Sequence, residues 1–333
     1  MKKTVRMADI AQQLGISTVS VSKALAGKPG VSEEMRTKVI ALARQMGYCG
    51  VRARYEPGLT GNIGVLVSDH LFSENSFYTN LYRELVLRCG EDGLSCIIEI
   101  VSQEAEQAAV PPTLVTQQRV DGVIFMGPLD SGYLEAVMAI ELPCLILDFR
   151  IPELQIDSIL RDNIEGGFLL TKHLLADGYK QIGFVGNIDQ SSNIMERYWG
   201  YQWALRQFGI VPRDEWVKKE LKEEAGPFFT SGKLPEAYVC GSNETAFHLA
   251  EIWQRSGHPN AAKIALACFD DFRGLSHLGL RPVTYRVEPK RMAEAAIQHL
   301  VSKIRREITS PSNYTISGQL IIANELRSGD QQL

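Results

Sequence analysis

Seven short apolar runs, each rich in β-branched residues, constrain the fold of this chain more than any other feature. Stretches with the 3.6-residue period of helices separate the runs, which lie at residues 63–67, 96–101, 120–126, 144–149, 181–186, 237–241 and 263–269. Continuous apolar strands that alternate with helices are typical of parallel sheets covered by helices on both faces. The segment 62–333 is longer than a single sheet of this kind requires. We therefore predict an α/β body of two lobes, each with a doubly wound parallel sheet.

The first 48 residues have a different pattern, with helical periodicity throughout. Met7–Lys23 predicts two short helices joined by a turn at Gly15, and Ser17 can cap the second helix. A third helix is expected after Ser32, with an apolar stripe that completes a small three-helix core. Two helices joined by so tight a turn favour a helix-turn-helix, which offers its second helix to a DNA major groove. An ordinary helical hairpin is the alternative.

The net charge of −4 is distributed unevenly along the chain. Residues 1–61 contain ten Lys or Arg and four acidic residues, a net charge of +6, and the other 25 basic and 35 acidic residues give the remainder −10. A small basic head on a large acidic body suits contact with nucleic-acid phosphates through the head alone. A basic surface that is merely solvated is the alternative.

Residues 49–61 read CGVRARYEPGLTG, with three Gly, one Pro and no sustained apolar period. This composition predicts a linker. The expected domains are therefore a helix-turn-helix domain over residues 1–48, an atypical linker or hinge over 49–61, and a two-lobed body over 62–333.

Several classes of protein are disfavoured. No apolar run approaches the ~18 residues that span a bilayer, and the start MKKTVRMADIAQQ lacks the apolar core of a signal peptide. We therefore expect a cytoplasmic protein that does not enter a membrane. The six cysteines have no C-x-x-C spacing, which indicates buried reduced thiols. Nucleotide-loop, nucleophile-elbow and zinc-protease motifs are missing and the histidines are scattered. We predict no catalytic residue, no cofactor and no metal site.

Polar residues follow the apolar runs at the carboxyl ends of the predicted strands, where open α/β sheets bind their ligands. They are Asp69, Asp148, Arg150, Asn187, Ser242, Asn243, Asp270 and Asp271.

Motifs along nearly the whole chain carry a family resemblance. They are Met7–Lys23, VSEEMRTKVIALARQMGY (31–48), IGVLV (63–67), VDGVIF (120–125), HLLADGYKQIGFVG (173–186), Arg-x-x-Gly-Tyr (197–201) and CFDDF (268–272). This ordered set resembles the lactose-repressor (LacI/GalR) family of bacterial transcription regulators. The resemblance implies a repressor with a periplasmic-binding-protein-like body, a sugar or sugar derivative as effector between the lobes, and a homodimer on a near-palindromic operator. A solute-binding protein with the same body and no transcriptional role is the alternative.

The resemblance also implies a set of DNA-contacting residues. Thr18, Val19 and Lys23 match the base-reading positions, since Lys can donate to guanine, Thr to either base type, and Val can touch a thymine methyl. Supporting contacts and phosphate contacts are expected from Ser20, Ser22, Thr4, Ser17 and Arg36. Packing between helices is the alternative role for Val19.

For the effector, the resemblance implies a polar clamp of Asp148, Arg197 and Asp270. Carboxylates and a guanidinium suit bidentate hydrogen bonds to vicinal hydroxyls or to a carboxylate. Weaker candidates on the same walls are Ser191, Asn193, Ser242 and Glu244, with Phe77 and Phe272 as apolar contacts. As alternatives, Arg197 is a surface arginine, Asp270 caps a loop, and Asp148 pairs with Arg150.

The chain departs from the family pattern at three places. Tyr55, Glu56 and Pro57 fall where the family's hinge helix carries a leucine that wedges into the minor groove, and Pro57 would end that helix. Leu221 falls near a position where sugar-binding relatives often have a stacking aromatic ring, and Trp216 is close by but outside the expected pocket. At the third place, Ser242-Asn243 follows the run at 237–241 where the family has an Asn-Asp pair. The last two departures weaken the expectation of a standard neutral sugar.

Overall fold

The computed structural model describes most of the chain. The described residues are 5–25, 28–46, 59–74, 76–189, 191–219, 221, 234–256, 264–270, 275, 278, 280 and 282–322. The domain boundaries predicted at residues 48 and 49, and most of the predicted linker, lie outside these residues. The expectations for the wedge positions also lie outside them.

The N-terminal head consists of three helices, α1 (Met7–Leu14), α2 (Thr18–Leu25) and α3 (Glu33–Met46). Their apolar faces meet in a small core made of Ile10, Ala11, Val21, Ala24, Val39 and Ala43. The cap predicted for the second helix is present, because the Ser17 hydroxyl accepts a hydrogen bond from the Ser20 N–H at 3.0 Å. The two short helices with a turn between them therefore form as the sequence predicts.

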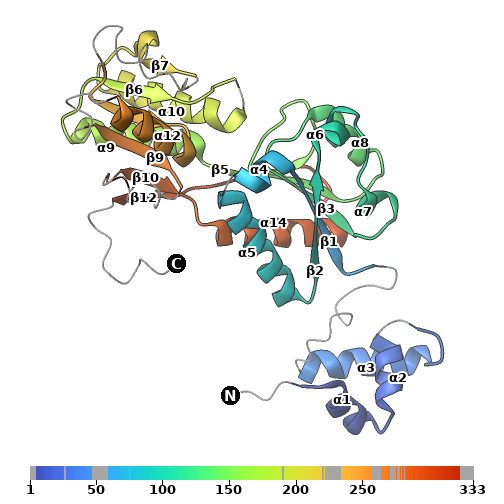
Figure 1. Cartoon of the computed structure of the whole chain (residues 1–333). Coiled ribbons are helices and arrows are strands. Elements are labelled where there is room, and N and C mark those ends of the chain that lie inside the picture. Colours follow the sequence, from blue (N-terminus) through green and yellow to red (C-terminus); the bar gives the residue numbers. More distant parts are fainter. Residues whose placement is uncertain are drawn as a thin grey trace.

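The first lobe is built on a six-stranded parallel sheet of order β11-β5-β4-β3-β1-β2. Its strands are β1 (Asn62–Ser68), β2 (Ser95–Val101), β3 (Gly122–Met126), β4 (Cys144–Leu147), β5 (Asp157–Arg161) and β11 (Asn313–Ile316). Figure 1 shows α5 (Ser76–Asp92) and α14 (Pro289–Ile304) on one side of this sheet, with α6 (Gln103–Gln107), α7 (Thr113–Thr116) and α8 (Ser131–Met138) on the other. The helix α4 (Asp69–Glu74) follows β1 directly.

The second lobe has a six-stranded sheet of order β12-β10-β9-β8-β6-β7. Its strands are β6 (Ile182–Val185), β7 (Val217–Lys218), β8 (Ala237–Cys240), β9 (Ala265–Phe269), β10 (Val283–Arg286) and β12 (Gln319–Ile322). Its main helices are α9 (Asn163–Ala176), α10 (Ser192–Gln207) and α12 (Asn243–Arg255), and the short 3-10 helix η1 (Asp214–Trp216) precedes β7. One prediction needs correction: β12 is antiparallel to β10, so this sheet is not purely parallel.

All seven apolar runs correspond to strands, namely β1, β2, β3, β4, β6, β8 and β9. Five strands were not predicted: β5, β7, β10, β11 and β12. The five described cysteines (Cys89, Cys96, Cys144, Cys240 and Cys268) are free thiols, in agreement with the expectation of reduced cysteines. Among the described residues, no helix is both long and apolar enough to cross a bilayer.

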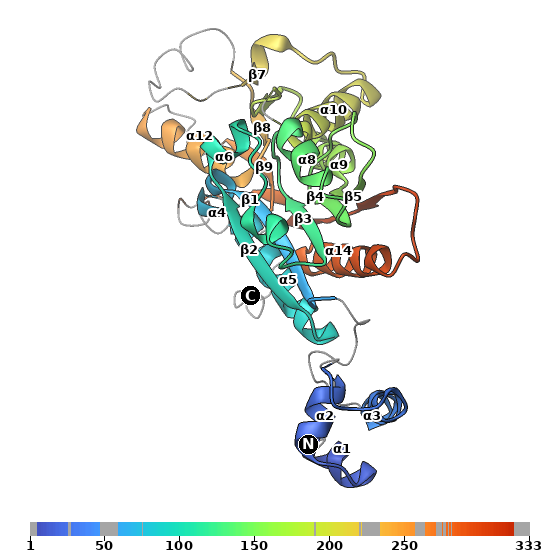
Figure 2. The ribbon, with the colours of Figure 1, turned by 90° about the vertical axis from the view of Figure 1, so that its right-hand side faces the viewer.

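The chain passes between the lobes three times, after β5, after β10 and between β11 and β12 (Figure 1). The second of these passages leads into α14, and Figure 2 shows α14 beside α5 of the first lobe. Tyr285 ties two passages together, because its hydroxyl accepts from the Gly318 N–H at 2.6 Å and donates to a Glu165 carboxylate oxygen at 2.8 Å. These crossings form a hinge that both lobes share.

Asp157 in β5 fastens α14 and β11 to the first sheet. Its carboxylate is 1% exposed and accepts hydrogen bonds from Lys303 Nζ and, at 2.9 Å, from the Ser312 N–H. His299 Nε2 lies 2.8 Å from the same carboxylate. Burial alone would raise the pKa of Asp157, but the hydrogen bond from Lys303 and the close contact with the His299 imidazole outweigh burial and lower it.

This lowered pKa predicts acid sensitivity. The Asp157 carboxylate should stabilise the fold fully above its unfolded-state pKa of about 3.9, and the contribution should disappear as pH falls through the lower native value. Asp157→Asn is expected to cost about 3 kcal/mol at pH 7, because Lys303 loses its buried partner. The difference between the variant and the original chain should shrink below about pH 4. Urea unfolding of both proteins at pH 7 and below about pH 4 checks this. An equal loss of unfolding free energy at the two pH values would contradict it.

Candidate functional site

Two glycines let α9 and α10 approach unusually closely and so place the side chains between the lobes. A Cβ on Gly167 would lie 2.1 Å from the Arg197 carbonyl oxygen, and a Cβ on Gly200 would lie 2.1 Å from that of Ile164. No side chain fits at either position. This contact fixes the Arg197 backbone against α9, next to Asn163 at the start of that helix.

A buried guanidinium lies at the centre of the site. Arg161, the last residue of β5, is 6% exposed and binds the carboxylate of Asp148 from the side, with Nε to Oδ1 at 2.6 Å and Nη2 to Oδ2 at 2.8 Å. The Tyr78 hydroxyl donates to the same carboxylate at 2.9 Å. The Phe77 ring lies under Arg161, with its centroid 4.0 Å from Cζ.

The same guanidinium reaches the second lobe. Arg161 Nη1 donates to both carboxylate oxygens of Asp270, at 2.8 and 2.9 Å, and Asp270 follows β9 of the second lobe. We refer to Asp148, Arg161 and Asp270 as the interlobe triad. Burial works against the charge on Arg161, but the two carboxylates outweigh burial and raise its pKa.

Both carboxylates of the triad are carried on unusual backbone. Asp148 has φ of 70° and Asp270 has φ of 66°, in the left-handed region that residues other than glycine rarely adopt. Each aspartate follows a strand end, so the left-handed turn points its side chain toward Arg161. Such strain is typical of ligand sites, where the surrounding contacts hold it in place.

Arg197 provides a second buried guanidinium, with only 2% exposure. Its Nε donates to the Asn163 side-chain oxygen at 2.8 Å, its Nη1 donates to the Gly241 carbonyl, and its Cζ lies 4.1 Å from the centroid of the Phe269 ring. Its Nη2 is buried without a hydrogen-bond partner among the described residues. Burial, followed by the like charge of Arg161, lowers the pKa of Arg197 to about 10.

Asparagine side chains connect the two guanidiniums. Asn193 Nδ2 donates across the lobes to the Asp148 carbonyl at 2.7 Å. Asn163 Nδ2 donates to Asn193 Oδ1 at 3.2 Å and to Glu196 Oε2 at 3.0 Å. Burial raises the pKa of Glu196. The Arg150 guanidinium lies 3.9 Å from Glu196, and the Arg150 N–H donates to Ser192 Oγ at 3.3 Å.

The structure thus brings together five of the predicted effector residues: Phe77, Asp148, Asn193, Arg197 and Asp270. Two alternatives are wrong, because Arg197 is buried and Asp148 pairs with Arg161 and not with Arg150. Ser191 and Ser242 act as helix caps, accepting from the N–H groups of Ile194 and Thr245. Phe272 lies outside the described residues.

Glu244 lines a cavity of about 420 Å³ at the carboxyl ends of β6 and β8, and burial, together with the nearby Asp270 charge, raises its pKa. Leu221, Lys219 and His248 also line this cavity. Trp216 is buried, packs under the Arg213 guanidinium, and does not line this cavity.

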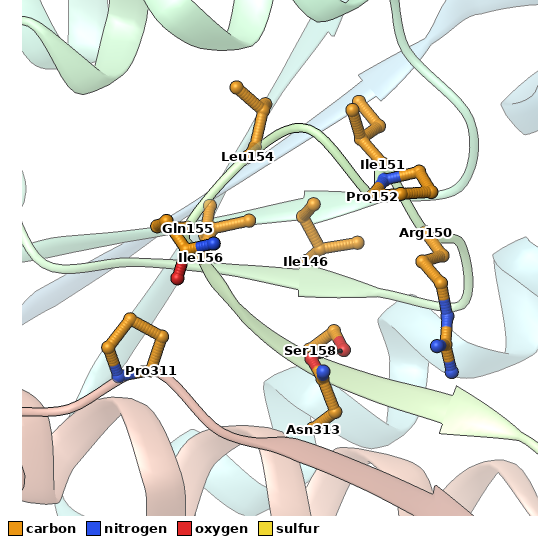
Figure 3. A pocket seen from close by; sticks show the side chains of 10 residues that line it. All are labelled: Ile146, Arg150, Ile151, Pro152, Leu154, Gln155, Ile156, Ser158, Pro311 and Asn313. Carbon is orange, nitrogen blue, oxygen red and sulfur yellow. Dashed lines mark hydrogen bonds between the residues drawn. The ribbon is translucent and has the colours of Figure 1, made fainter.

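Figure 3 shows a separate cavity of about 300 Å³ in the first lobe, between the β4–β5 loop and β11. Ile151, Leu154 and Pro311 are among its apolar walls, and Ser158 donates to Asn313 at 2.6 Å on its polar side. None of the predicted effector residues lines it.

Arg161, Asn163 and Tyr78 were missed in the sequence. Arg161 ends the strand DSILR, whose polar residues hide its strand character, although an arginine directly before Asp162-Asn163 at a strand end is a usable signal. Tyr78 follows Phe77 on α5, and nothing local marks it as a partner of a residue 70 positions away.

The head presents a polar surface along α2. Thr18, Ser22 and Lys23 are exposed and Val19 is 61% exposed, so packing of Val19 between helices is wrong. Ser20 and Ser17 share a hydroxyl contact of 2.9 Å. Arg36 is largely buried and donates to Glu33 and to the Lys28 carbonyl, and Thr4 lies outside the described residues.

Both parts of the chain match known families. Residues 6–50 match the bacterial regulatory proteins of the lacI family, and residues 60–324 match the periplasmic binding proteins and sugar binding domain of the LacI family. The chain belongs to the LacI family. It is a DNA-binding transcriptional repressor with a small-molecule effector, and it is not an enzyme.

Curated relatives span nearly the same length. The ribose operon repressor of Haemophilus influenzae is 26% identical over 308 residues, covering 90% of this chain and 92% of the relative. The maltose regulon regulatory protein MalI of Escherichia coli is 27% identical over 341 residues, covering 96% and 98%.

Solved structures share the fold. A complex of the transcriptional regulator CelR with cellobiose has a TM-score of 0.70 at 19% identity, covering 95% of this chain and 98% of that one. The lac repressor dimer bound to operator and the anti-inducer ONPF has a TM-score of 0.67 at 22% identity, covering 98% and 100%.

The close approach of α9 and α10 gives a testable prediction. Gly200→Ala should destabilise the fold by about 1–3 kcal/mol, because the added methyl group forces the two helices apart. Gly90→Ala in α5 is the matched control, since its Cβ would meet nothing within 4 Å and alanine favours a helix. Thermal unfolding of both variants checks this, and equal melting temperatures would contradict it.

Proposed function

We propose that α2 reads a near-palindromic operator for a cytoplasmic homodimeric repressor, and that a sugar or sugar derivative controls it by binding at the interlobe triad. The observation that carries this proposal is a buried charged network that links two lobes at the carboxyl ends of their strands. Because the same chain carries a DNA-binding head, a change in this network can control DNA binding.

The exposed residues of α2 supply the chemistry for base reading. Lys23 can donate to the O6 and N7 atoms of guanine, and Thr18 can bind either base type. Val19 offers its methyl groups to thymine, which its exposure allows. Ser17, at the start of α2, can bind a phosphate and set the register of the helix without reading sequence.

The site between the lobes suits a small polar ligand. The triad, Arg197 and Asn193 offer donors and acceptors on both lobes within one network. The names of the ribose operon repressor and of the CelR–cellobiose complex support a sugar or a sugar derivative as the ligand class.

Control of DNA binding follows from the hinge. A ligand that contacts both lobes favours one angle between them, and the three crossings pass that change to the first lobe, from which the head extends. The coupling must be reciprocal, so operator binding has to change the affinity for the effector by the same factor.

Selection of binding sites from random DNA by the full chain tests this function. We expect a near-palindromic consensus, and a small polar ligand that raises the melting temperature should also change operator affinity. Recovery of no consensus sequence would overturn the proposal.

Lys23→Ala is expected to weaken binding to the selected operator by about 1–3 kcal/mol and to relax the preference at one base position. Lys38→Ala is a suitable control, because it removes the same charge from an exposed site on α3. Fluorescence anisotropy with operators changed at single positions measures both effects. An unchanged base preference would remove Lys23 from the reading set.

A further inference from the structure

Arg161 binds the two carboxylates of the triad unequally. Asp148 is 0% exposed and receives two separate N–H groups of the guanidinium within the first lobe. Asp270 is 12% exposed, belongs to the second lobe, and receives only Nη1. The contact between the lobes is thus the more accessible and the less firmly held of the two.

Arg197 lacks the counter-ion that Arg161 has. Its hydrogen bonds go to the neutral oxygens of Asn163 and Gly241, and among the described residues it has no ion pair within 4.0 Å. Its buried Nη2 also has no acceptor there. A buried cation with an unused donor is costly unless a ligand completes it.

The Asp270 carboxylate lies within electrostatic reach of both guanidiniums. Its charge raises the pKa of Arg161 and opposes the lowering of the pKa of Arg197, yet it donates nothing to and accepts nothing from Arg197. The charge of Asp270 therefore acts on both guanidiniums, although Asp270 is hydrogen-bonded only to Arg161.

We propose that the effector carries a carboxylate or phosphate group, and that Asp270 is an internal substitute for that anion. On binding, the anion of the effector replaces Asp270 at Arg161 Nη1 and accepts the unused hydrogen bond from Arg197 Nη2. This inference rests on the proposed function, because it identifies the chemical class of the ligand at the same site.

Charge balance favours an anion over a neutral sugar. When Asp270 is released to water, the anion of the effector takes over its charge beside the two guanidiniums, and Asp148 stays in place. A neutral sugar would instead have to replace a charge-assisted contact with hydroxyl groups, which form weaker hydrogen bonds. The Asp148 carboxylate is no better available to sugar hydroxyls, because Arg161 and Tyr78 already bind it.

The exchange also supplies the conformational signal. The Arg161–Asp270 pair joins the lobes directly, so an anion that replaces Asp270 removes a link that the chain makes by itself. Effector binding is thereby converted into the loss of this link between the lobes at the hinge.

The test compares matched ligands on the full chain at equal ionic strength. D-ribose, D-ribonate and D-ribose 5-phosphate form one set, and D-glucose, D-glucuronate and D-glucose 6-phosphate form the other. Thermal shift and calorimetry should show binding by acidic members and at least tenfold weaker binding by the neutral parent. The carboxylate and phosphate arms distinguish the two kinds of anion. Equal or tighter binding by a neutral sugar would overturn the proposal, and this outcome needs no variant.

Asp270→Asn removes the internal anion and keeps its shape. We expect about tenfold tighter binding of acidic ligands and a lower melting temperature without ligand. Asp177→Asn is the matched control, because it removes an exposed carboxylate from the C-cap of α9 in the same lobe, and it should change affinity less than twofold. Weaker binding of acidic ligands by Asp270→Asn than by the original chain overturns the proposal.

Arg197→Gln should weaken the binding of acidic ligands at least tenfold. If no ligand binds the original chain, the same sets are applied to Asp270→Asn, which should bind the acids once the competitor is gone; no binding there also overturns the proposal. Failure of the proposed function is recognised separately, because operator selection then yields no consensus whatever the ligands do.

Discussion

The arrangement of the two lobes depends on one buried guanidinium that holds a carboxylate from each of them. Removing Arg161, Asp148 and Asp270 from water costs several kcal/mol per ion, and the short, partly bidentate contacts offset that cost only when all three groups are in place. Loss of any one partner leaves a buried charge uncompensated. The triad therefore acts as a unit, and the left-handed backbone of both aspartates shows that the strand ends are shaped to complete it.

The surrounding architecture makes this unit sensitive to a ligand. Asp148 and Asp270 follow strands of different sheets, and Arg161 ends the strand that leads into the first crossing between the lobes. Any movement of Asp270 relative to Arg161 is therefore a movement of one sheet relative to the other. Tyr285 keeps two of the crossings together through Gly318 and Glu165, so the lobes can change their angle without losing their connection. Packed lobes on such a hinge favour discrete arrangements over gradual deformation.

Burial explains how far the sequence could predict the structure. Six of the seven predicted strands lie inside their sheets, where apolar side chains on both faces leave a continuous apolar run, and β2 lies at an edge of the first sheet. Strand β5 was missed because Asp157, Ser158 and Arg161 occupy buried positions in it. Their partners lie far along the chain, with 146 positions between Asp157 and Lys303 and 109 between Arg161 and Asp270. Local patterns carry no information about such pairs, so the family resemblance located Asp148, Arg197 and Asp270 while the residue that joins two of them was overlooked.

An internal anion also determines the ligand concentration to which the chain responds. A tethered carboxylate competes at an effective concentration in the millimolar range for short connections. An acidic effector must exceed that competition before it displaces Asp270, so its apparent affinity is reduced by the fraction of molecules in which the site is free. The Arg161–Asp270 contact is the weaker half of the triad, which keeps this reduction moderate. A repressor built in this way ignores traces of an anionic metabolite and responds once the metabolite accumulates, and the contact between the lobes sets that threshold.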